Sequence, residues 1–203
     1  MHKEILNKNQ IELLPLVKQF KREFYLVGGT AIALHLGHRR SIDYDLFKLK
    51  RLVLNRILNK ISATEHVYTV TRRAEEQLNL NINNVKFTFY NYPYSVEANC
   101  LFEDVIKIPN LLNLAAMKAF ALGRRSKWKD YIDLYYILKN HYSINQIVEV
   151  SNNIYGQLFS EKLFRAQLSY FEDIDYSEPV EFLIKEPSGK EIQEFLIEKA
   201  IEL

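Results

Sequence analysis

Two aspartates near the end of the first quarter of the chain, Asp43 and Asp45, are two residues apart in the segment SIDYDLF at residues 41–47. The alternation of polar and apolar residues predicts a strand, and its period of two would place both carboxylates on one face. Adjacent carboxylates repel each other, and a shared cation relieves that repulsion. Oxygen ligands suit Mg²⁺ or Mn²⁺. We therefore predict a metal site, although a solvated edge strand explains the same pattern.

A second candidate feature is the short run Gly28, Gly29 and Thr30, which separates the apolar residues 24–27 from a helical pattern at 31–36. Glycines allow a ligand to approach the backbone closely, and a helix N-terminus offers free N–H groups to a phosphate. Thr30 adds a hydroxyl and can also cap the helix. The run predicts a phosphate-binding turn, and an ordinary tight turn with a capped helix is the simpler alternative.

The remaining candidates are cations and one further carboxylate. Arg39 and Arg40 precede the aspartate pair and can hold a triphosphate or a nucleic-acid backbone. Lys118 lies in an apolar helical segment, where a lysine either snorkels to the surface or meets an anion. Arg125 follows it. Asp130 begins the next helical segment, where the helix dipole favours an acidic residue, and it is also a possible partner for Lys118 or for an attacking hydroxyl.

The elements that must position these residues follow the order helix, mixed α/β block, helical second half. The predicted helices before residue 109 are 8–22, 31–36 and 49–61, and the predicted strands are 24–27, 41–47, 67–73, 77–83, 85–90 and 105–108. A turn at Asn83 and Asn84 joins two of these strands. We predict an α+β fold, with an α/β core over residues 1–108 and a helical part over residues 109–203 that completes the active site.

Composition limits the classes of protein that this chain represents. Its 203 residues, 48% hydrophobic and 26% charged, are typical of a globular protein. The single cysteine, Cys100, excludes a disulfide within the chain and a cysteine-based metal cluster, and it fits a reducing compartment. The longest apolar stretch, residues 111–122, contains Asn113 and Lys118. We therefore expect a cytoplasmic protein that has neither a secretion signal nor a membrane segment.

The net charge of +2 is unevenly distributed along the chain. Residues 1–160 carry 22 Lys and Arg against 14 Asp and Glu, a net charge of +8, whereas residues 161–203 carry 5 against 11, a net charge of −6. A basic body with an acidic tail is compatible with a polyanionic partner such as RNA, and equally with a charge distribution that keeps the protein in solution. The sequence leaves open whether the acidic tail binds a partner or folds back onto the basic body.

These pieces together resemble a known family. The segments LVGGTAIALHLGHRRSIDYDLF (26–47) and MKAFALGRRSKWKDYIDLYYIL (117–138), with NVKFTFYNYPYS (84–95) between them, are similar to the AbiEii/AbiGii-type nucleotidyltransferase toxins. The similarity extends over residues 20–140. The first and last segments are specific in combination, because each contains several uncommon residues in the same order.

The resemblance implies a DNA polymerase β-like nucleotidyltransferase core with a mixed sheet and a helical C-terminal part. It implies transfer of a nucleotide from an NTP to an acceptor, which in some members is the 3′ end of tRNA, in bacterial toxin–antitoxin or phage-defence pairs. A cognate antitoxin is then a possible partner. By matching positions, Gly29 and Thr30 would hold the triphosphate, with Thr30 standing where many superfamily members have serine, and Asp43 and Asp45 would hold catalytic Mg²⁺ or Mn²⁺. Lys118 would contact phosphate, and Asp130 would be the acidic residue of the second half. To the nucleotide-binding residues we add Gly28, Arg39, Arg40 and Arg125 from their own chemistry and position.

One departure from the superfamily pattern concerns a third carboxylate, which many members carry on a later strand. The outward-facing residues of the corresponding strand here are Lys86, Thr88 and Tyr90. Asp130 is the best replacement as the group that activates the acceptor. Three alternatives remain: transfer to a small molecule or a protein, a degenerate module that binds NTP without turnover, and a structural or interaction protein in which the motifs occur by chance.

Overall fold

The computed structural model describes residues 1–122 and 124–202. Its centre is a seven-stranded mixed sheet in the order β3-β4-β5-β2-β1-β7-β6. The strands are β1 (Tyr25–Val27), β2 (Tyr44–Lys48), β3 (Tyr68–Arg73), β4 (Gln77–Ile82), β5 (Val85–Asn91), β6 (Cys100–Phe102) and β7 (Ile106–Ile108). β2 runs parallel to β5 and antiparallel to β1. The α+β fold with a mixed sheet, predicted from the sequence, is confirmed.

The hairpin β4–β5 shows how local sequence fixes this sheet. Asn83 and Asn84 have φ angles of 50° and 62°, the left-handed region that asparagine tolerates better than most residues. Leu78, Leu80 and Ile82 of β4 alternate with polar residues and are fully buried. Because alternate side chains point to opposite faces, one face of the hairpin joins the core and the other is left polar.

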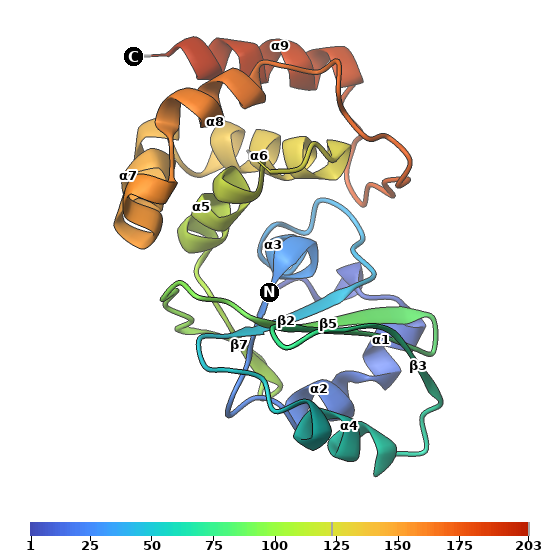
Figure 1. Ribbon diagram of the computed structural model, residues 1–203. Helices are drawn as coiled ribbons and strands as arrows, with labels where there is room; N and C mark the ends of the chain where they lie inside the picture. The colour runs from blue at the N-terminus through green and yellow to red at the C-terminus, as the bar shows by residue number, and fades with distance from the viewer. Residues whose placement is uncertain (123, 203) are drawn as a thin grey trace.

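The helices α1 (Lys8–Glu12), α2 (Leu14–Lys18) and α4 (Leu54–Ser62) cover one face of the sheet, as Figure 1 shows. The core under them is aromatic, with edge-on contacts among Phe20, Phe24 and Phe89. On the opposite face, α3 (Gly28–Leu36) lies above β1 and β2. The two faces therefore differ, since one is packed against several helices and the other is only partly covered.

The second half of the chain is helical and lies on the same side of the sheet as α3 (Figure 1). Its helices are α5 (Leu111–Leu122), α6 (Trp128–Asn140), α7 (Ile144–Tyr155), α8 (Glu161–Leu168) and α9 (Gly189–Ile201). The rings of Phe120 in α5 and Tyr155 in α7 stack at 3.8 Å. Apolar residues of sheet and helices form one continuous core. No helix within the described part of the chain has the length and apolar character needed to cross a membrane.

Several predicted element boundaries were wrong for identifiable reasons. The predicted helix 8–22 is two short helices, because Pro15 begins a new helical turn in α2. α3 begins at Gly28, so Thr30 lies inside it and does not cap it. β2 begins at Tyr44 and leaves residues 41–43 in a loop. The predicted helix 49–61 starts later, at Leu54, and β6 was not anticipated.

The acidic C-terminal region folds back onto the basic body. Glu178 forms ion pairs with Lys127 and Lys129, and Glu181 pairs with Arg40 at 2.7 Å. The backbone N–H of Arg40 also donates to the carbonyl oxygen of Glu181. Charge attraction within the chain thus accounts for part of the acidic tail, which the sequence alone left open.

Candidate active site

A cleft of about 500 Å³ opens between the sheet and the helical half. Its floor is the polar face of β2, β4 and β5, and its walls are the N-terminus of α3 and one side of α5. The predicted site residues that line it are Gly28, Asp45, Lys118 and Arg125. Residues from both halves of the chain therefore meet in one cleft.

Gly28 lies directly against the Asp45 carboxylate at the start of α3. The φ angle of Gly28 is +72°, and a Cβ atom at this position would collide with Oδ2 of Asp45. Both observations require glycine. The turn therefore brings the N-terminus of a helix and a carboxylate into contact, which is the geometry that a phosphate with its counter-cation needs.

Burial is the main cause of the raised pKa of Asp45, and the charge of Asp43 raises it further. The hydroxyl of Thr88, which stands opposite Asp45 on β5, works in the other direction, as do Arg125 and Lys86. A cation bound beside Asp45 would favour the ionised form of its carboxyl group.

Asp43 lies in the loop before β2, and only Asp45 belongs to the strand. The alternation along one strand that we expected to align the two aspartates is therefore absent. The hydroxyl of Thr30 holds the loop instead, because it donates to the carbonyl oxygen of Asp43 and contacts Ser41 Oγ at 3.0 Å. Thr30 is almost fully buried and is not among the residues that line the cleft. Its side chain thus positions the loop, whereas its predicted contact with a triphosphate stays a prediction.

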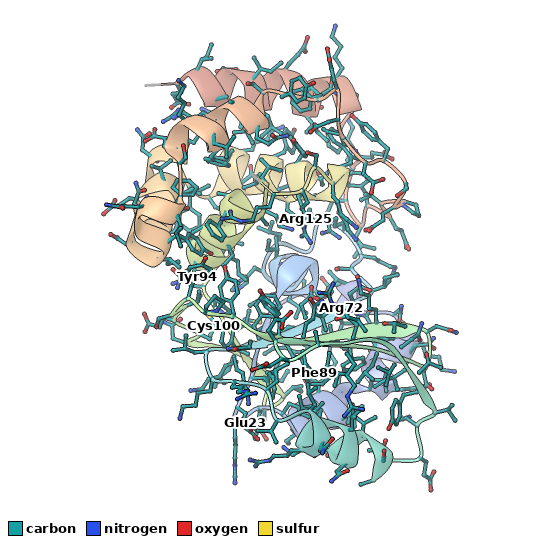
Figure 2. The ribbon with its side chains drawn as sticks, in the orientation of Figure 1. Glu23, Arg72, Phe89, Tyr94, Cys100 and Arg125 are labelled. Atoms are coloured by element: carbon teal, nitrogen blue, oxygen red, sulfur yellow. The ribbon has the colours of Figure 1, made fainter. Side chains whose placement is uncertain are left out.

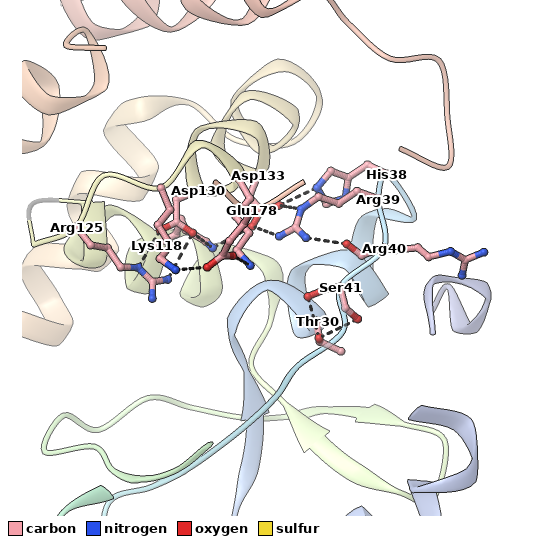
Figure 3. Close-up of polar contacts among 12 residues, drawn as sticks. Thr30, His38, Arg39, Arg40, Ser41, Lys118, Arg125, Asp130, Asp133 and Glu178 are labelled. Atoms are coloured by element: carbon pink, nitrogen blue, oxygen red, sulfur yellow. Dashed lines mark hydrogen bonds and ion pairs between the residues drawn. The ribbon is translucent and has the colours of Figure 1, made fainter. Parts of the chain in front are cut away.

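A buried chain of charges joins the helical half to the loop before β2 (Figure 3). The Lys118 ammonium donates to Asp130 Oδ1 at 2.7 Å and lies 2.9 Å from Asp133 Oδ2. Asp133 also accepts two hydrogen bonds from Arg39, at 2.8 and 2.9 Å, and one from His38 Nε2 at 2.8 Å. Each carboxylate is thus shared by more than one donor.

These contacts determine the ionisation of the buried groups. Burial alone would raise the pKa of Asp133, but Arg39 and Lys118 hold it well below its usual range. The pKa of Asp130 is likewise lowered, because Lys118 and Arg125 outweigh the effect of burial. Burial lowers the pKa of His38, which is therefore neutral at pH 7. A carboxylate with a lowered pKa and two cationic partners is a weak proton acceptor.

The three arginines predicted to bind nucleotide occupy different places. Arg125 lies at the cleft, with its side chain half-exposed and its Nε 2.9 Å from Asp130 Oδ2. Arg39 is only 2% exposed, and Asp133 accepts hydrogen bonds from its guanidinium. Arg40 pairs with Glu181 and points away from the buried charges in Figure 3. Of the three arginines, Arg125 lines the cleft, and Arg39 and Arg40 lie outside it.

Sequence reasoning gave Asp133 no role in the site, although this residue connects Lys118 with Arg39. Its spacing of three from Asp130 puts both carboxylates on one helical face, and that spacing was the available signal. His38 also reaches this carboxylate, because its Nε2 donates a hydrogen bond to Asp133 Oδ1. Thr88 lines the cleft on β5 opposite Asp45, so the strand on which the superfamily pattern led us to look for a third carboxylate carries a threonine there.

The donor set at the cleft fits one kind of metal site. Among residues 1–122 and 124–202, no group of three or more histidine, cysteine or carboxylate side chains converges as a complete metal cage. Asp45 lines the cleft, whereas Asp43, two residues earlier in the chain, is not among the lining residues. Mg²⁺ is commonly held by one or two carboxylates together with substrate phosphates, so a substrate-completed site fits these residues.

The fold is that of nucleotidyltransferases. MenT4, a nucleotidyltransferase toxin from Mycobacterium tuberculosis, superposes with a TM-score of 0.67 at 14% identity, covering 95% of this chain and 80% of MenT4. JHP933 from Helicobacter pylori gives a TM-score of 0.54 at 14% identity, covering 98% and 88%. An uncharacterised protein from Aquifex aeolicus is 28% identical over 207 residues, 97% of each chain.

Residues 16–198 match the family of nucleotidyl transferase AbiEii toxins of type IV toxin–antitoxin systems. This match spans most of the 203 residues, and the chain belongs to that family. The resemblance noted in the sequence is thereby confirmed, and it includes both the sheet and the helices.

Proposed function

We propose that this protein transfers a nucleoside monophosphate from an NTP to the 3′ end of an RNA, with tRNA as the principal acceptor. The observation that carries the proposal is the cleft itself, where Gly28 and Asp45 face Lys118 and Arg125 across one opening. A helix N-terminus, a carboxylate pair and two cations are the groups that a metal-bound triphosphate requires.

The triphosphate would bind between the two walls of the cleft. Backbone N–H groups at Gly28 and Gly29 would donate to phosphate oxygens, and the φ angle of Gly28 supports this close approach. Lys118 and Arg125 would contact the same anion from the opposite wall. Each of these cations already has a carboxylate partner, so their side chains are held in place before the substrate arrives.

Asp43 and Asp45 would hold Mg²⁺ or Mn²⁺ beside the phosphates. When bound, the metal neutralises charge on the triphosphate and lowers the pKa of the attacking hydroxyl. The hydroxyl oxygen forms a bond to the α-phosphorus while the bond to the bridging oxygen breaks and pyrophosphate leaves. Thr88 stands opposite Asp45 on β5, and its hydroxyl would orient the acceptor.

Asp130 would act as a positioning residue. Its two carboxylate oxygens accept hydrogen bonds from Lys118 and Arg125, and its pKa is lowered. This arrangement favours orientation of the cations over removal of a proton from the acceptor. The proton of the acceptor hydroxyl would leave to water in the open cleft.

The two parts of the chain would contribute different groups to the active site. Residues 1–108 would form the catalytic core, and residues 109–203 would complete the site by supplying Lys118 and Arg125. As a toxin, the protein would act in a bacterial cytoplasm and be restrained by a cognate antitoxin, in a toxin–antitoxin or phage-defence pair. The net charge of +8 over residues 1–160 favours a polyanionic acceptor.

The testing experiment is a transfer assay with total tRNA, Mg²⁺ or Mn²⁺, and each α-labelled NTP in turn. Asp43→Ala should abolish labelling, and Asp104→Ala, an exposed carboxylate that pairs with Lys18 and Lys21, should not. Label on tRNA that persists in Asp43→Ala would refute the mechanism. Metal-dependent NTP binding without transfer to any RNA, protein or small molecule would favour the degenerate module, for which the threonine at position 88 is the main support.

A further inference from the structure

Among the described residues, no helix lies directly on one face of the half-sheet formed by β3, β4 and β5. In Figure 1, α1, α2 and α4 lie on the opposite face, and α3 lies above β2 and β1. The cleft extends onto this open face, because Gln77, Asn79 and Lys86 line it together with Asp45. A surface that begins at Asp45 and continues outward over three strands is therefore available to a ligand.

Strand pairing identifies which side chains occupy the open face. Residues directly opposite each other in antiparallel strands point to the same side. Arg72 of β3 is opposite Asn79, and Asn81 is opposite Lys86. Gln77 is opposite Tyr90, which also lines the cleft. Figure 2 shows Arg72 on the side of the sheet that carries the cleft and Glu23 on the other side.

The side chains on this open face are polar or aromatic, and those that carry a charge are cationic. The face combines two exposed cations, Arg72 and Lys86, with the amides of Gln77, Asn79 and Asn81 and the ring of Tyr90. None of these six side chains is acidic. Cations bind phosphates, amides pair with base edges, and an aromatic ring stacks on a base. Base edges and ring faces are accessible only in unpaired nucleotides.

We propose that the open face of β3–β4–β5 binds the single-stranded 3′ end of the acceptor RNA and leads its terminal hydroxyl to Asp45. The proposal rests on the proposed function and names the surface that the acceptor uses. Three strand spacings separate β3 from β2, a distance of about 14 Å. A few unpaired nucleotides span that distance, with their phosphates toward Arg72 and Lys86.

Neighbouring residues of β3 provide a matched pair of variants. Arg72 and Arg73 are both exposed and belong to the same edge strand, but Arg73 is opposite the buried Leu78 and contacts Asn55 of α4 at 3.3 Å. Arg73 therefore points to the far face. Arg72→Glu and Arg73→Glu change the net charge equally, and only the first changes the open face. Lys86→Glu is less specific, because Lys86 also acts on the pKa of Asp45.

The experiment measures binding of a labelled single-stranded RNA with a free 3′ hydroxyl by fluorescence anisotropy over a range of salt concentrations. Arg72→Glu should weaken binding by about tenfold and reduce the slope of log K against log salt by about one. Arg73→Glu should leave both unchanged. In the transfer assay, Arg72→Glu should raise KM for RNA by a similar factor, without changing kcat or KM for the NTP.

The outcomes separate this inference from the proposed function. Equal effects of the two variants, or no effect of Arg72→Glu on RNA binding, would overturn the inference even if the wild type modifies RNA. Absence of transfer to RNA would overturn the proposed function, whereas selective loss of RNA binding in Arg72→Glu would still support the surface. If Arg72→Glu instead impaired labelling of a protein acceptor and left RNA binding intact, the assignment to RNA would be wrong.

Discussion

Asp133 is the residue whose removal should destabilise this protein most through charge alone. Its side chain is fully buried and contacts the guanidinium of Arg39, the ammonium of Lys118 and the ring of His38. Asp133→Asn retains the shape of the side chain but removes its charge. Arg39, which is nearly as buried, would then lose the carboxylate that it pairs with, and Lys118 would keep only Asp130, which also pairs with Arg125.

The expected cost follows from this imbalance. Removing one partner of a buried ion pair typically costs about 3–5 kcal/mol, because the remaining charge is neither solvated nor paired. The asparagine amide still accepts one hydrogen bond, so we expect a value within that range rather than above it. For a domain of this size the loss corresponds to a decrease in Tm of about 6–20 °C.

The assay is thermal and urea unfolding of the wild type, Asp133→Asn, Arg39→Gln and the double variant. The double variant should recover part of the loss, because it removes the unpaired guanidinium. Asp104→Asn is the control: Asp104 also contacts two lysines, Lys18 and Lys21, but its side chain is 76% exposed. A loss below about 1 kcal/mol in Asp133→Asn, equal to a surface pair, would refute the reasoning.

Three further outcomes are expected from the site. Gly28→Ala should abolish transfer, because a Cβ would collide with Asp45, whereas Gly156→Ala, at another positive φ but with free space around it, should retain activity. Asp130→Asn should raise KM for the NTP more than it lowers kcat if this residue positions cations, and steady-state kinetics distinguish the two effects. The folded-state pKa of Asp133 is depressed, so its contribution to stability is fully present above about pH 4, the unfolded value, and is lost as pH falls toward the folded pKa. Acid unfolding of Asp133→Asn should therefore depend less steeply on pH than that of the wild type.

The sequence was sufficient to predict the elements that carry strong local signals. Asn83 and Asn84 adopt the left-handed conformation expected of a tight hairpin turn, and the alternation in β4 predicted its buried face. The start of β2 was harder to place. Ser41–Asp43 has strand-like alternation, but these residues form a loop that Thr30 holds by a side-chain hydrogen bond. Such a tertiary contact has no counterpart in periodicity.

The partners of charged side chains were the least predictable part of the site. Arg39 and Arg125 have the same chemistry and both neighbour predicted site residues in the sequence. Arg39 is buried against Asp133, from the other half of the chain, and Arg125 stays half-exposed at the cleft. Sequence spacing gives the helical face of Asp133 but not the segment that packs against it. The direction in which an arginine points therefore depends on how the halves dock.

The docking of the helical half onto the sheet affects both the stability of the fold and the geometry of the site. Lys118 approaches the cleft from α5, and Asp133 of α6 holds both Lys118 and Arg39, which precedes the loop that carries Asp43. A single buried carboxylate thus joins the proposed phosphate-binding cation to the segment with the proposed metal ligands. A displacement of the helical half would separate Asp133 from Arg39 and move Lys118 away from the aspartates. Such a displacement is costly, because it would leave buried charges unpaired. The helical half therefore acts as a structural part of the candidate active site.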